Sequence, residues 1–398
     1  MAPPPVRLRC LCSVELRAVI ACAVAFVVAA LATPLAARLA RRIGAVDAMP
    51  ERGLARQATP LLGGLAIFAG AIVASLLLLP DNSHAGAILI GAALITLVGA
   101  VDDVRPLHPA VKLLGQIAAA LVLVRNDVTV DSFTLPFLHH VSLGGLGEPV
   151  TLLGLVLLMN VVNFSDGVDG LAAGVCAISA AAFSVIAFDL GRSTAAILAA
   201  ITCGAALGFL LHNFHPASVF MGDCGSNLLG LLLGAVIIEG TLKTNALIAL
   251  VGPLVALAVP FLDTGFVVAK RLKYRRPVYR ADSNHFHHRF HRIGFSQRRT
   301  VLYLYGWTFM MSGLAVALRF VPYSESSGHL RAGWAILMGA LLLGGIVTSF
   351  YLVYVLEIVK LRRLRAWQIR RAEPDTSEHD IDDAIDRELE TGEFTTLS

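Results

Sequence analysis

Long apolar segments recur along the whole chain, and they constrain its fold more than any other feature. Each is long enough, or nearly so, to cross a hydrocarbon layer about 30 Å thick as a helix. They lie at about 16–39, 61–80, 85–101, 110–125, 149–163, 170–189, 193–211, 226–242, 245–268, 300–321 and 332–357. Of all 398 residues 56% are hydrophobic and only 15% charged, too few charges to cover a soluble protein of this length. We therefore predict an all-α polytopic membrane protein with about 11 transmembrane helices.

The distribution of Lys and Arg predicts how this bundle is oriented, because cytoplasmic connections are enriched in basic residues. If the N-terminus lies outside, 24 of the 32 Lys and Arg fall on the cytoplasmic side. We therefore expect a short extracytoplasmic N-terminus (1–15), a transmembrane catalytic bundle (16–357) with a cytoplasmic loop (269–300), and a cytoplasmic tail (358–398). The tail is acidic and polar, which predicts disorder. Alternating apolar residues in 126–148 predict a small hairpin on the outer side.

Acidic and polar residues gather where the predicted spans end. These residues are Asp102 and Asp103 after the third span, Asn163, Asp166 and Asp169 after the fifth, Asp223 before the eighth and Asp263 in the ninth. The orientation derived from basic residues alone brings all of them to the cytoplasmic surface. A single Asp at a span end is often only a helix cap. Adjacent carboxylates repel each other and need a cation, a proton or a metal, so the first pair predicts more than a cap.

Spacing and composition indicate what these residues could bind. Asp166 and Asp169 are three residues apart and share a face if that turn is helical. Carboxylates without thiolate partners suit Mg²⁺, with Mn²⁺ as an alternative, especially where a phosphate completes the coordination. Loop 269–300 carries a histidine cluster among arginines, which favours binding of a pyrophosphate over zinc. This cluster contains His285, His287, His288, Arg289 and His291. Together these features predict a phosphoryl-transfer site.

Four motifs in a fixed order also resemble the polyprenyl-phosphate N-acetylhexosamine-1-phosphate transferase superfamily (glycosyltransferase family 4). They are Asp102-Asp103 followed by Lys112, NVVNFSDGVDGLAAG (160–174), FMGDCGS (220–226) and D-x-x-HFHHRFHRIGFSQRR (282–299). The segment TPLLGG (59–64) extends the resemblance to about 52–300. The HFHHR pattern looks like the branch that uses UDP-GlcNAc. The peptidoglycan branch, which uses UDP-MurNAc-pentapeptide, typically has a pattern resembling P-x-H-H-H-[FY]-E.

The resemblance implies a reaction and a set of roles. The reaction is transfer of GlcNAc-1-phosphate from UDP-GlcNAc to undecaprenyl or another polyprenyl phosphate, with release of UMP, at the cytoplasmic face of a bacterial inner (plasma) membrane. Asp223 would bind Mg²⁺, with Asp166 as a second candidate ligand, and Asp102 and Asp103 would bind or deprotonate the lipid phosphate. The resemblance also implies substrate-binding roles for Lys112, Asn163, Asp166, Asp169, His285, His287, His288 and Arg289.

Other classes of protein fit parts of the pattern. A phospho-MurNAc-pentapeptide transferase would share most of the motifs. A secondary transporter would also carry intramembrane carboxylates, but it would place them near the midplane rather than at one surface. The expected partners are UDP-GlcNAc, the polyprenyl phosphate and the membrane, with no nucleic acid; the sequence leaves a homodimer open.

Overall fold

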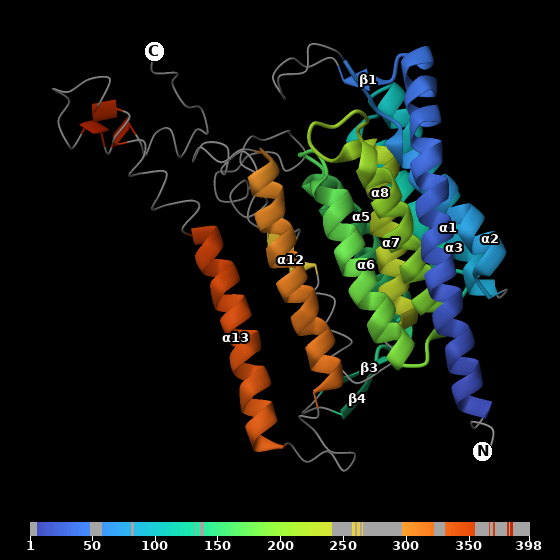
Figure 1. The fold of residues 1–398 in the computed structure, drawn as a ribbon, viewed down its shortest axis with the longest axis vertical. Helices are drawn as coiled ribbons and strands as arrows, with labels where there is room; N and C mark the ends of the chain where they lie inside the picture. Colours follow the sequence, from blue (N-terminus) through green and yellow to red (C-terminus); the bar gives the residue numbers. More distant parts are fainter. Residues whose placement is uncertain are drawn as a thin grey trace.

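The chain forms a bundle of long helices in a computed structural model (Figure 1). The structure describes residues 6–47, 58–80, 83–130, 132–135, 139–240, 257–258, 261–262, 265, 297–321, 331–354, 366, 369–370, 380–381 and 383–384. The helices of the bundle are α1 (Val6–Ile43), α2 (Gly63–Leu78), α3 (Ser83–Val104), α4 (Pro109–Val124), α5 (Gly147–Ser165), α6 (Leu171–Asp189), α7 (Ser193–Asn213), α8 (Gly222–Gly240), α12 (Gln297–Phe320) and α13 (Ala332–Tyr354).

The helices coincide with the predicted spans wherever the structure describes the chain. The first helix is longer than its predicted span, because it begins at Val6 rather than near residue 16. Within the described residues, seven helices are long and apolar enough to cross a membrane, and α2, α4 and part of α13 are shorter apolar helices. The predicted span 245–268 lies almost entirely outside the described residues. The all-α membrane fold is therefore confirmed, while the number of spans and the orientation stay predictions.

Five buried hydroxyl side chains are satisfied by the helix that carries them. Thr33, Thr96, Thr151, Ser165 and Thr202 each donate a hydrogen bond to the carbonyl four residues earlier, at 2.7–2.9 Å. Such local bonds pair these five hydroxyls in an apolar environment, where an unpaired polar group is costly. These residues therefore do not interrupt the apolar helices.

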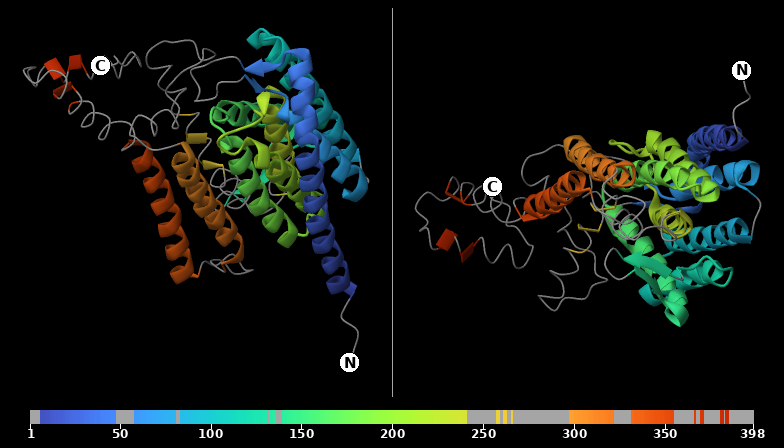
Figure 2. Two further views of the ribbon diagram at one scale, coloured as in Figure 1. Left: turned by 45° about the horizontal axis from the view of Figure 1, so that its top comes forward. Right: turned by 90° about the horizontal axis from the view of Figure 1, so that it is seen from below.

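Helix α8 lies at the centre of the bundle. It packs against α2, α3, α5, α6 and α7, and each of its residues from Cys224 to Ile238 is buried. The outer helices instead expose large apolar side chains, among them Leu31, Leu76 and Leu153. Apolar side chains on the outer surface are what a protein surrounded by lipid requires. Helices α12 and α13 form one side of the bundle, with α12 packed on α6 (Figure 2).

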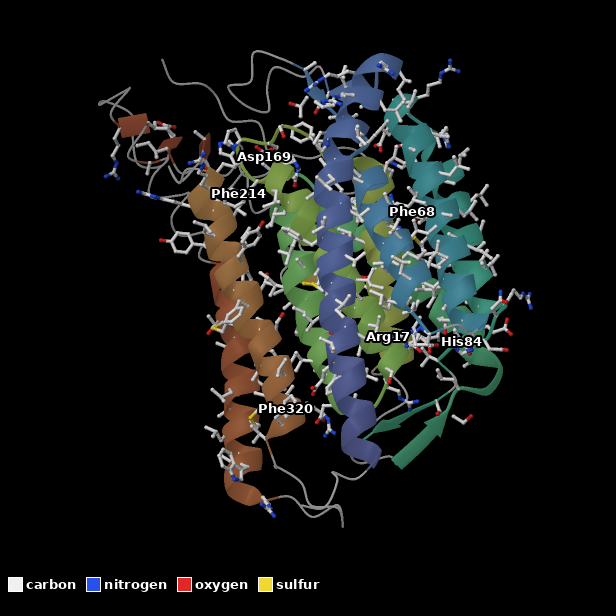
Figure 3. All side chains as sticks on the ribbon, turned by 45° about the vertical axis from the view of Figure 1, so that its right-hand side comes forward. Arg17, Phe68, His84, Asp169, Phe214 and Phe320 are labelled. Carbon is white, nitrogen blue, oxygen red and sulfur yellow. The ribbon has the colours of Figure 1, made fainter. Side chains whose placement is uncertain are left out.

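Short strands and turns close the two ends of the bundle. The strands β1 (Val46–Asp47) and β2 (Thr59–Pro60) pair at one end, while β3 (Ser132–Leu135) and β4 (His139–Ser142) pair at the other (Figure 1). The second pair confirms the predicted hairpin, and the 3₁₀ turn η2 (Gly144–Leu146) leads from it into α5. Figure 3 shows Asp169 and Phe214 at the β1–β2 end, with Arg17, His84 and Phe320 toward the opposite end.

Candidate active site

The predicted polar residues meet at the β1–β2 end of the bundle. Helices α3 and α5 end there with Asp102, Asp103 and Asn163, whereas α4 and α8 begin there with Lys112 and Asp223. These four helices are neighbours, because α8 packs against α3 and α5, and α4 packs against both of these as well. The expectation that distant clusters reach one surface is therefore confirmed for these residues.

The first turn of α8 is built around Asp103. Its two carboxylate oxygens accept hydrogen bonds from the backbone N–H groups of Asp223 (2.7 Å) and Cys224 (3.1 Å). A helix N-terminus carries unpaired N–H groups and partial positive charge, so a carboxylate is a favourable cap. Gly222 precedes this turn with φ of +70°, and a Cβ there would lie 2.4 Å from the Asp103 carboxylate. Asp103 thus caps a neighbouring helix. The sequence had predicted more than a cap for the adjacent pair Asp102 and Asp103.

The TPLLGG segment holds the same turn from the other side. The N–H groups of Gly63 and Gly64 donate to the carbonyls of Phe220 (3.0 Å) and Met221 (2.9 Å), and Phe220 N–H donates to the carbonyl of Pro60 (2.9 Å). A Cβ on Gly64 would lie 2.1 Å from the backbone nitrogen of Gly225. The motif therefore acts through its backbone, by letting α2 approach the start of α8 directly.

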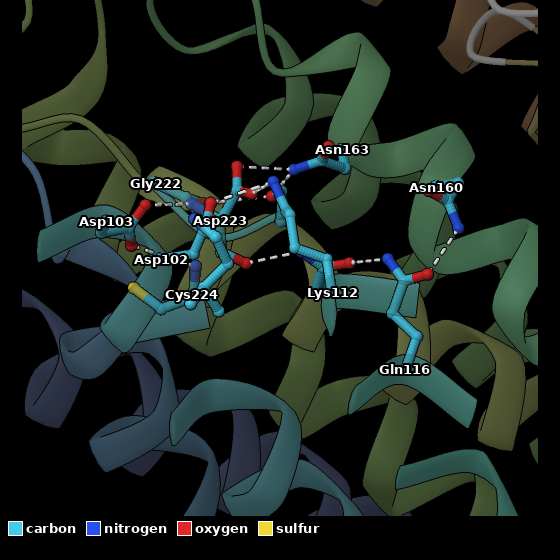
Figure 4. Close-up of polar contacts among 12 residues, drawn as sticks. Asp102, Asp103, Lys112, Gln116, Asn160, Asn163, Gly222, Asp223 and Cys224 are labelled. Atoms are coloured by element: carbon cyan, nitrogen blue, oxygen red, sulfur yellow. Dashed lines mark hydrogen bonds and ion pairs between the residues drawn. The ribbon is translucent and has the colours of Figure 1, made fainter. Parts of the chain in front are cut away.

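Lys112 lies between two acidic side chains (Figure 4). Its Nζ is 2.9 Å from Oδ2 of Asp102 and also forms an ion pair with Asp223. Asp102 is anchored in turn, because its Oδ1 accepts a hydrogen bond from the N–H of Leu107 at 2.7 Å. The side chains of Asp102, Asp223 and Lys112 are 12%, 23% and 30% exposed, so the cluster is sheltered but open to a ligand.

Asn163 orients the acid at the start of α8. Its Nδ2 donates to Oδ1 of Asp223 and to the hydroxyl of Ser226, both at 2.9 Å. Asp223 is therefore held on one oxygen by an amide and on the other by Lys112. Ser226 is the last residue of the FMGDCGS motif, but its pairing with Asn163 could not be foreseen; its hydroxyl also donates to the carbonyl of Gly222, one turn earlier.

Asp166 and Asp169 do not share a helical face, contrary to what their spacing suggested. Helix α5 ends at Ser165, Asp166 is its C-cap with ψ of 49°, and Gly170 follows with φ of +78° before α6 begins. Asp169 turns toward the segment after α7, where its Oδ2 contacts Nδ1 of His215 (2.7 Å) and accepts from the N–H of Ala217 (3.1 Å). The glycines on either side break the helical repeat on which the prediction depended.

His215 is a polar residue that the sequence interpretation missed. Besides its contact with Asp169, its carbonyl accepts a hydrogen bond from Nε of Arg298 at 3.0 Å, which ties the start of α12 to the same end of the bundle. The predicted His285, His287, His288 and Arg289, together with Asp263, lie outside the described residues. Their proximity to the carboxylates stays a prediction.

The described side chains do not form a complete metal cage by themselves. Within the part of the chain that the structure describes, no three His, Cys, Asp or Glu side chains are grouped closely enough to hold an ion. Asp103 is committed to backbone N–H groups, which leaves Asp102 and Asp223 as the acids with oxygens directed at Lys112.

Comparison with known proteins places this site in a family. The family model for glycosyl transferase family 4 matches residues 85–241, the region that carries Asp102, Lys112, Asn163 and Asp223. A probable undecaprenyl-phosphate N-acetylglucosaminyl 1-phosphate transferase of Bacillus subtilis is 36% identical over 307 residues, covering 76% of this chain and 86% of the relative. The chain belongs to glycosyl transferase family 4.

Other relatives in this family carry two kinds of name. A decaprenyl-phosphate N-acetylglucosaminephosphotransferase of Mycobacterium leprae is 35% identical over 355 residues, covering 80% of this chain and 86% of the relative. A phospho-N-acetylmuramoyl-pentapeptide-transferase of Desulforudis audaxviator is 33% identical over 299 residues, covering 68% of this chain and 85% of the relative. The resemblance inferred from the motifs is therefore confirmed, and the shared region extends further in the N-acetylglucosamine group than in the muramoyl relative.

Proposed function

We propose that the chain transfers GlcNAc-1-phosphate from UDP-GlcNAc to a polyprenyl phosphate and releases UMP, as the first membrane step of cell-envelope polysaccharide synthesis. A phosphate oxygen of the lipid attacks the β-phosphorus of the nucleotide sugar, and the bond from that phosphorus to the oxygen bridging to UMP breaks. One phosphoanhydride replaces another, so no further energy source is required. The observation that carries the proposal is the Lys112 ammonium, which is held between Asp102 and Asp223 within the region that matches the family model.

The main chemical task at this site is to bring together two anionic phosphates. Lys112 is placed to bind a phosphate oxygen, because its ammonium is held at a sheltered surface and can exchange a carboxylate partner for a phosphate. Asp102 stays oriented by its bond to Leu107, and it can accept the proton of a protonated lipid phosphate. Asn163 keeps Asp223 in one orientation while Lys112 changes partner.

Mg²⁺ is the proposed cofactor, and the donor set is compatible with it. The space between Asp102 and Asp223 already accommodates a cationic group in contact with carboxylate oxygens of both residues. Mg²⁺ is usually held by one or two carboxylates together with phosphate oxygens and water, so two acids suffice when a diphosphate is present. Bound there, the ion would neutralise charge on the transferring phosphates. Mn²⁺ is an alternative, and Asp166 remains a proposed additional ligand.

The proposed location is the inner membrane of a bacterium, with the site facing the cytoplasm. It rests on the excess of Lys and Arg in the connections predicted to be cytoplasmic, above all the ten in 269–300. That segment also carries the proposed donor-binding residues His285, His287, His288 and Arg289. Its basic residues suit a diphosphate, and we propose that they bind the donor.

A panel of nucleotide sugars tests the function. Purified protein with Mg²⁺ and a polyprenyl phosphate is given UDP-GlcNAc, UDP-GalNAc or UDP-MurNAc-pentapeptide in separate reactions, and the lipid fraction is analysed by mass spectrometry. We expect GlcNAc pyrophosphoryl-lipid and UMP from UDP-GlcNAc, less product from UDP-GalNAc and none from the pentapeptide donor. Product from the pentapeptide donor alone would show that the chain belongs to the muramoyl branch instead. No lipid product with any donor would favour a transporter.

A second arm of this experiment tests the donor loop. His287→Ala and His288→Ala should lose more activity than the matched variant His291→Ala, which alters the same loop and residue type. Arg289→Lys should also be poor, because an ammonium cannot reproduce the planar pair of donors that a guanidinium offers to a phosphate. Equal losses in all four variants would indicate that the loop contributes only general charge.

A further inference from the structure

A second polar layer lies directly beneath the charged residues, inside the apolar part of the bundle. It consists of three amides, Gln116 on α4, Asn160 on α5 and Asn227 on α8, which we call the amide layer. Figure 4 labels Gln116 and Asn160. Gln116 and Asn227 are only 4% and 3% exposed. Asn160 is partly buried. A buried amide in an apolar helix bundle is costly unless it is paired, so three amides that meet at one level need a reason.

The amide layer is continuous across the three helices. Nδ2 of Asn160 donates to Oε1 of Gln116 at 2.8 Å, and Nε2 of Gln116 donates to Oδ1 of Asn227 at 2.7 Å. Nδ2 of Asn227 then donates to the backbone carbonyl of Asp223 at 2.8 Å. The last bond connects the amide layer to the residue that carries the central acid of the site.

Each amide also lies one helical turn from a charged or polar residue of the site. Gln116 follows Lys112 by four residues, and Asn227 follows Asp223 by four. Asn160 precedes Asn163 by three, on a helix that runs the opposite way. Residues three or four apart lie on the same face of a helix. The two layers therefore use the same faces of the same three helices, and the amide layer lies deeper in the bundle, with Gln116 and Asn227 buried.

We infer that the amide layer sets the rotation of α4, α5 and α8, so that Lys112, Asn163 and Asp223 converge. Apolar side chains can slide past one another, whereas paired amides accept one register only. Gln116, Asn160 and Asn227 are positioning residues that act through Lys112 and Asp223. The expected effect on the rate of transfer rests on the proposed function.

The test replaces two of the three amides, both partners of one buried hydrogen bond, with apolar side chains. Gln116→Met and Asn227→Leu put unbranched or γ-branched apolar side chains of similar length at both positions, and Asn160 keeps its second hydrogen bond, to the carbonyl of Val156 at 2.8 Å. Replacing both partners of a buried hydrogen bond with apolar groups of similar shape is often nearly neutral for stability. We expect kcat for GlcNAc-1-phosphate transfer to fall at least about tenfold, with KM for UDP-GlcNAc within about twofold of the wild type.

The matched control removes a buried hydrogen bond elsewhere between two helices. Ser349→Ala on α13 deletes the bond that Nε1 of Trp307 donates to the Ser349 hydroxyl at 3.1 Å. It should lower Tm without changing kcat. A kcat loss in the Met/Leu variant no larger than in this control would overturn the inference.

A readout that needs no activity separates this inference from the proposed function. Tm is measured for Lys112→Ala, Asp223→Ala and the pair, in the wild-type and the Met/Leu backgrounds. We expect the two single effects to be non-additive in the wild type and additive in the Met/Leu background. Equal non-additivity in both backgrounds would refute a positioning role, even if the wild type proved inactive on UDP-GlcNAc. If the Met/Leu variant does not fold, Gln116→Asn replaces it, because the shorter amide cannot reach Asn227. Adding Asn227→Gln should then restore the non-additivity.

Discussion

Substitution of Gly222 by alanine gives the sharpest test of how the site is built. The backbone at Gly222 has φ of +70°, and strain from any Cβ in this region costs about 1–2 kcal/mol. The added Cβ would also lie 2.4 Å from Oδ2 of Asp103, so the carboxylate must retreat about 1 Å to reach the 3.4 Å of ordinary contact. That carboxylate is fixed by backbone N–H groups at 2.7 and 3.1 Å, and a retreat of this size takes both beyond hydrogen-bonding distance.

The expected result combines a loss of stability with a large loss of activity. Losing a charged hydrogen bond costs about 1.5–3 kcal/mol, so losing both costs about 3–6 kcal/mol, and we expect the bundle to remain folded. A displacement of about 1 Å in the residues that align substrates can cost about a hundredfold in rate. We therefore expect Gly222→Ala to insert and purify normally, with kcat for UMP release at least about a hundredfold lower.

Gly191→Ala is the matched control, since it shares the backbone strain but not the contact. Gly191 has φ of +71°, and nothing lies within 4 Å of its Cβ position. It should lose about 1–2 kcal/mol of stability and keep its kcat. If Gly222→Ala turns over at the rate of Gly191→Ala, the close fit between Asp103 and the first turn of α8 is not needed for activity, and the reasoning above is wrong.

Three further predictions concern the carboxylates and the membrane orientation. Asp223→Ala should abolish turnover while the protein still inserts and extracts normally; near-wild-type activity at saturating Mg²⁺ would remove this residue from the proposed metal site. Asp102→Asn should lower kcat at least about a hundredfold with little change in Tm, because its carboxylate faces Lys112 rather than the N–H groups of a helix end. In intact cells, an impermeant thiol reagent should label Ser142→Cys and not Ser283→Cys; the reverse pattern would overturn the cytoplasmic location of the site.

Much of the fold could be read from the sequence, because apolar length alone defines helices in a membrane protein. The sequence also indicated that Asp102, Asn163 and Asp223 come together, since all three end or begin spans on one side. It could not indicate what Asp103 does, because the N–H groups that it caps lie 120 and 121 residues away on another helix. The local spacing of residues cannot predict which distant helix ends contact each other.

The side-chain direction of Asp169 and the role of Gln116 could not be predicted, for opposite reasons. Asp169 was placed with Asp166 by helical spacing, but the backbone at Gly170 leaves the helix and turns Asp169 toward His215. Gln116 did carry a signal, because it stands in an apolar helix four residues after Lys112. A polar residue one turn below a charged one, repeated at Asn227 below Asp223, is a pattern that sequence reasoning can use.

The close contact between glycine backbones at the start of α8 also bears on how the site can move. At Gly64 and Gly99 an added Cβ would lie 2.1 Å and 2.4 Å from backbone atoms of α8, so no side chains separate α8 from α2 and α3 at this level. Side chains between helices can change rotamer and absorb displacement, whereas backbone against backbone has little to yield. The acid at the start of α8 therefore lies at a rigid corner shared by three helices. We therefore expect that any movement which admits a long-chain lipid takes place in other elements, while this corner keeps its geometry.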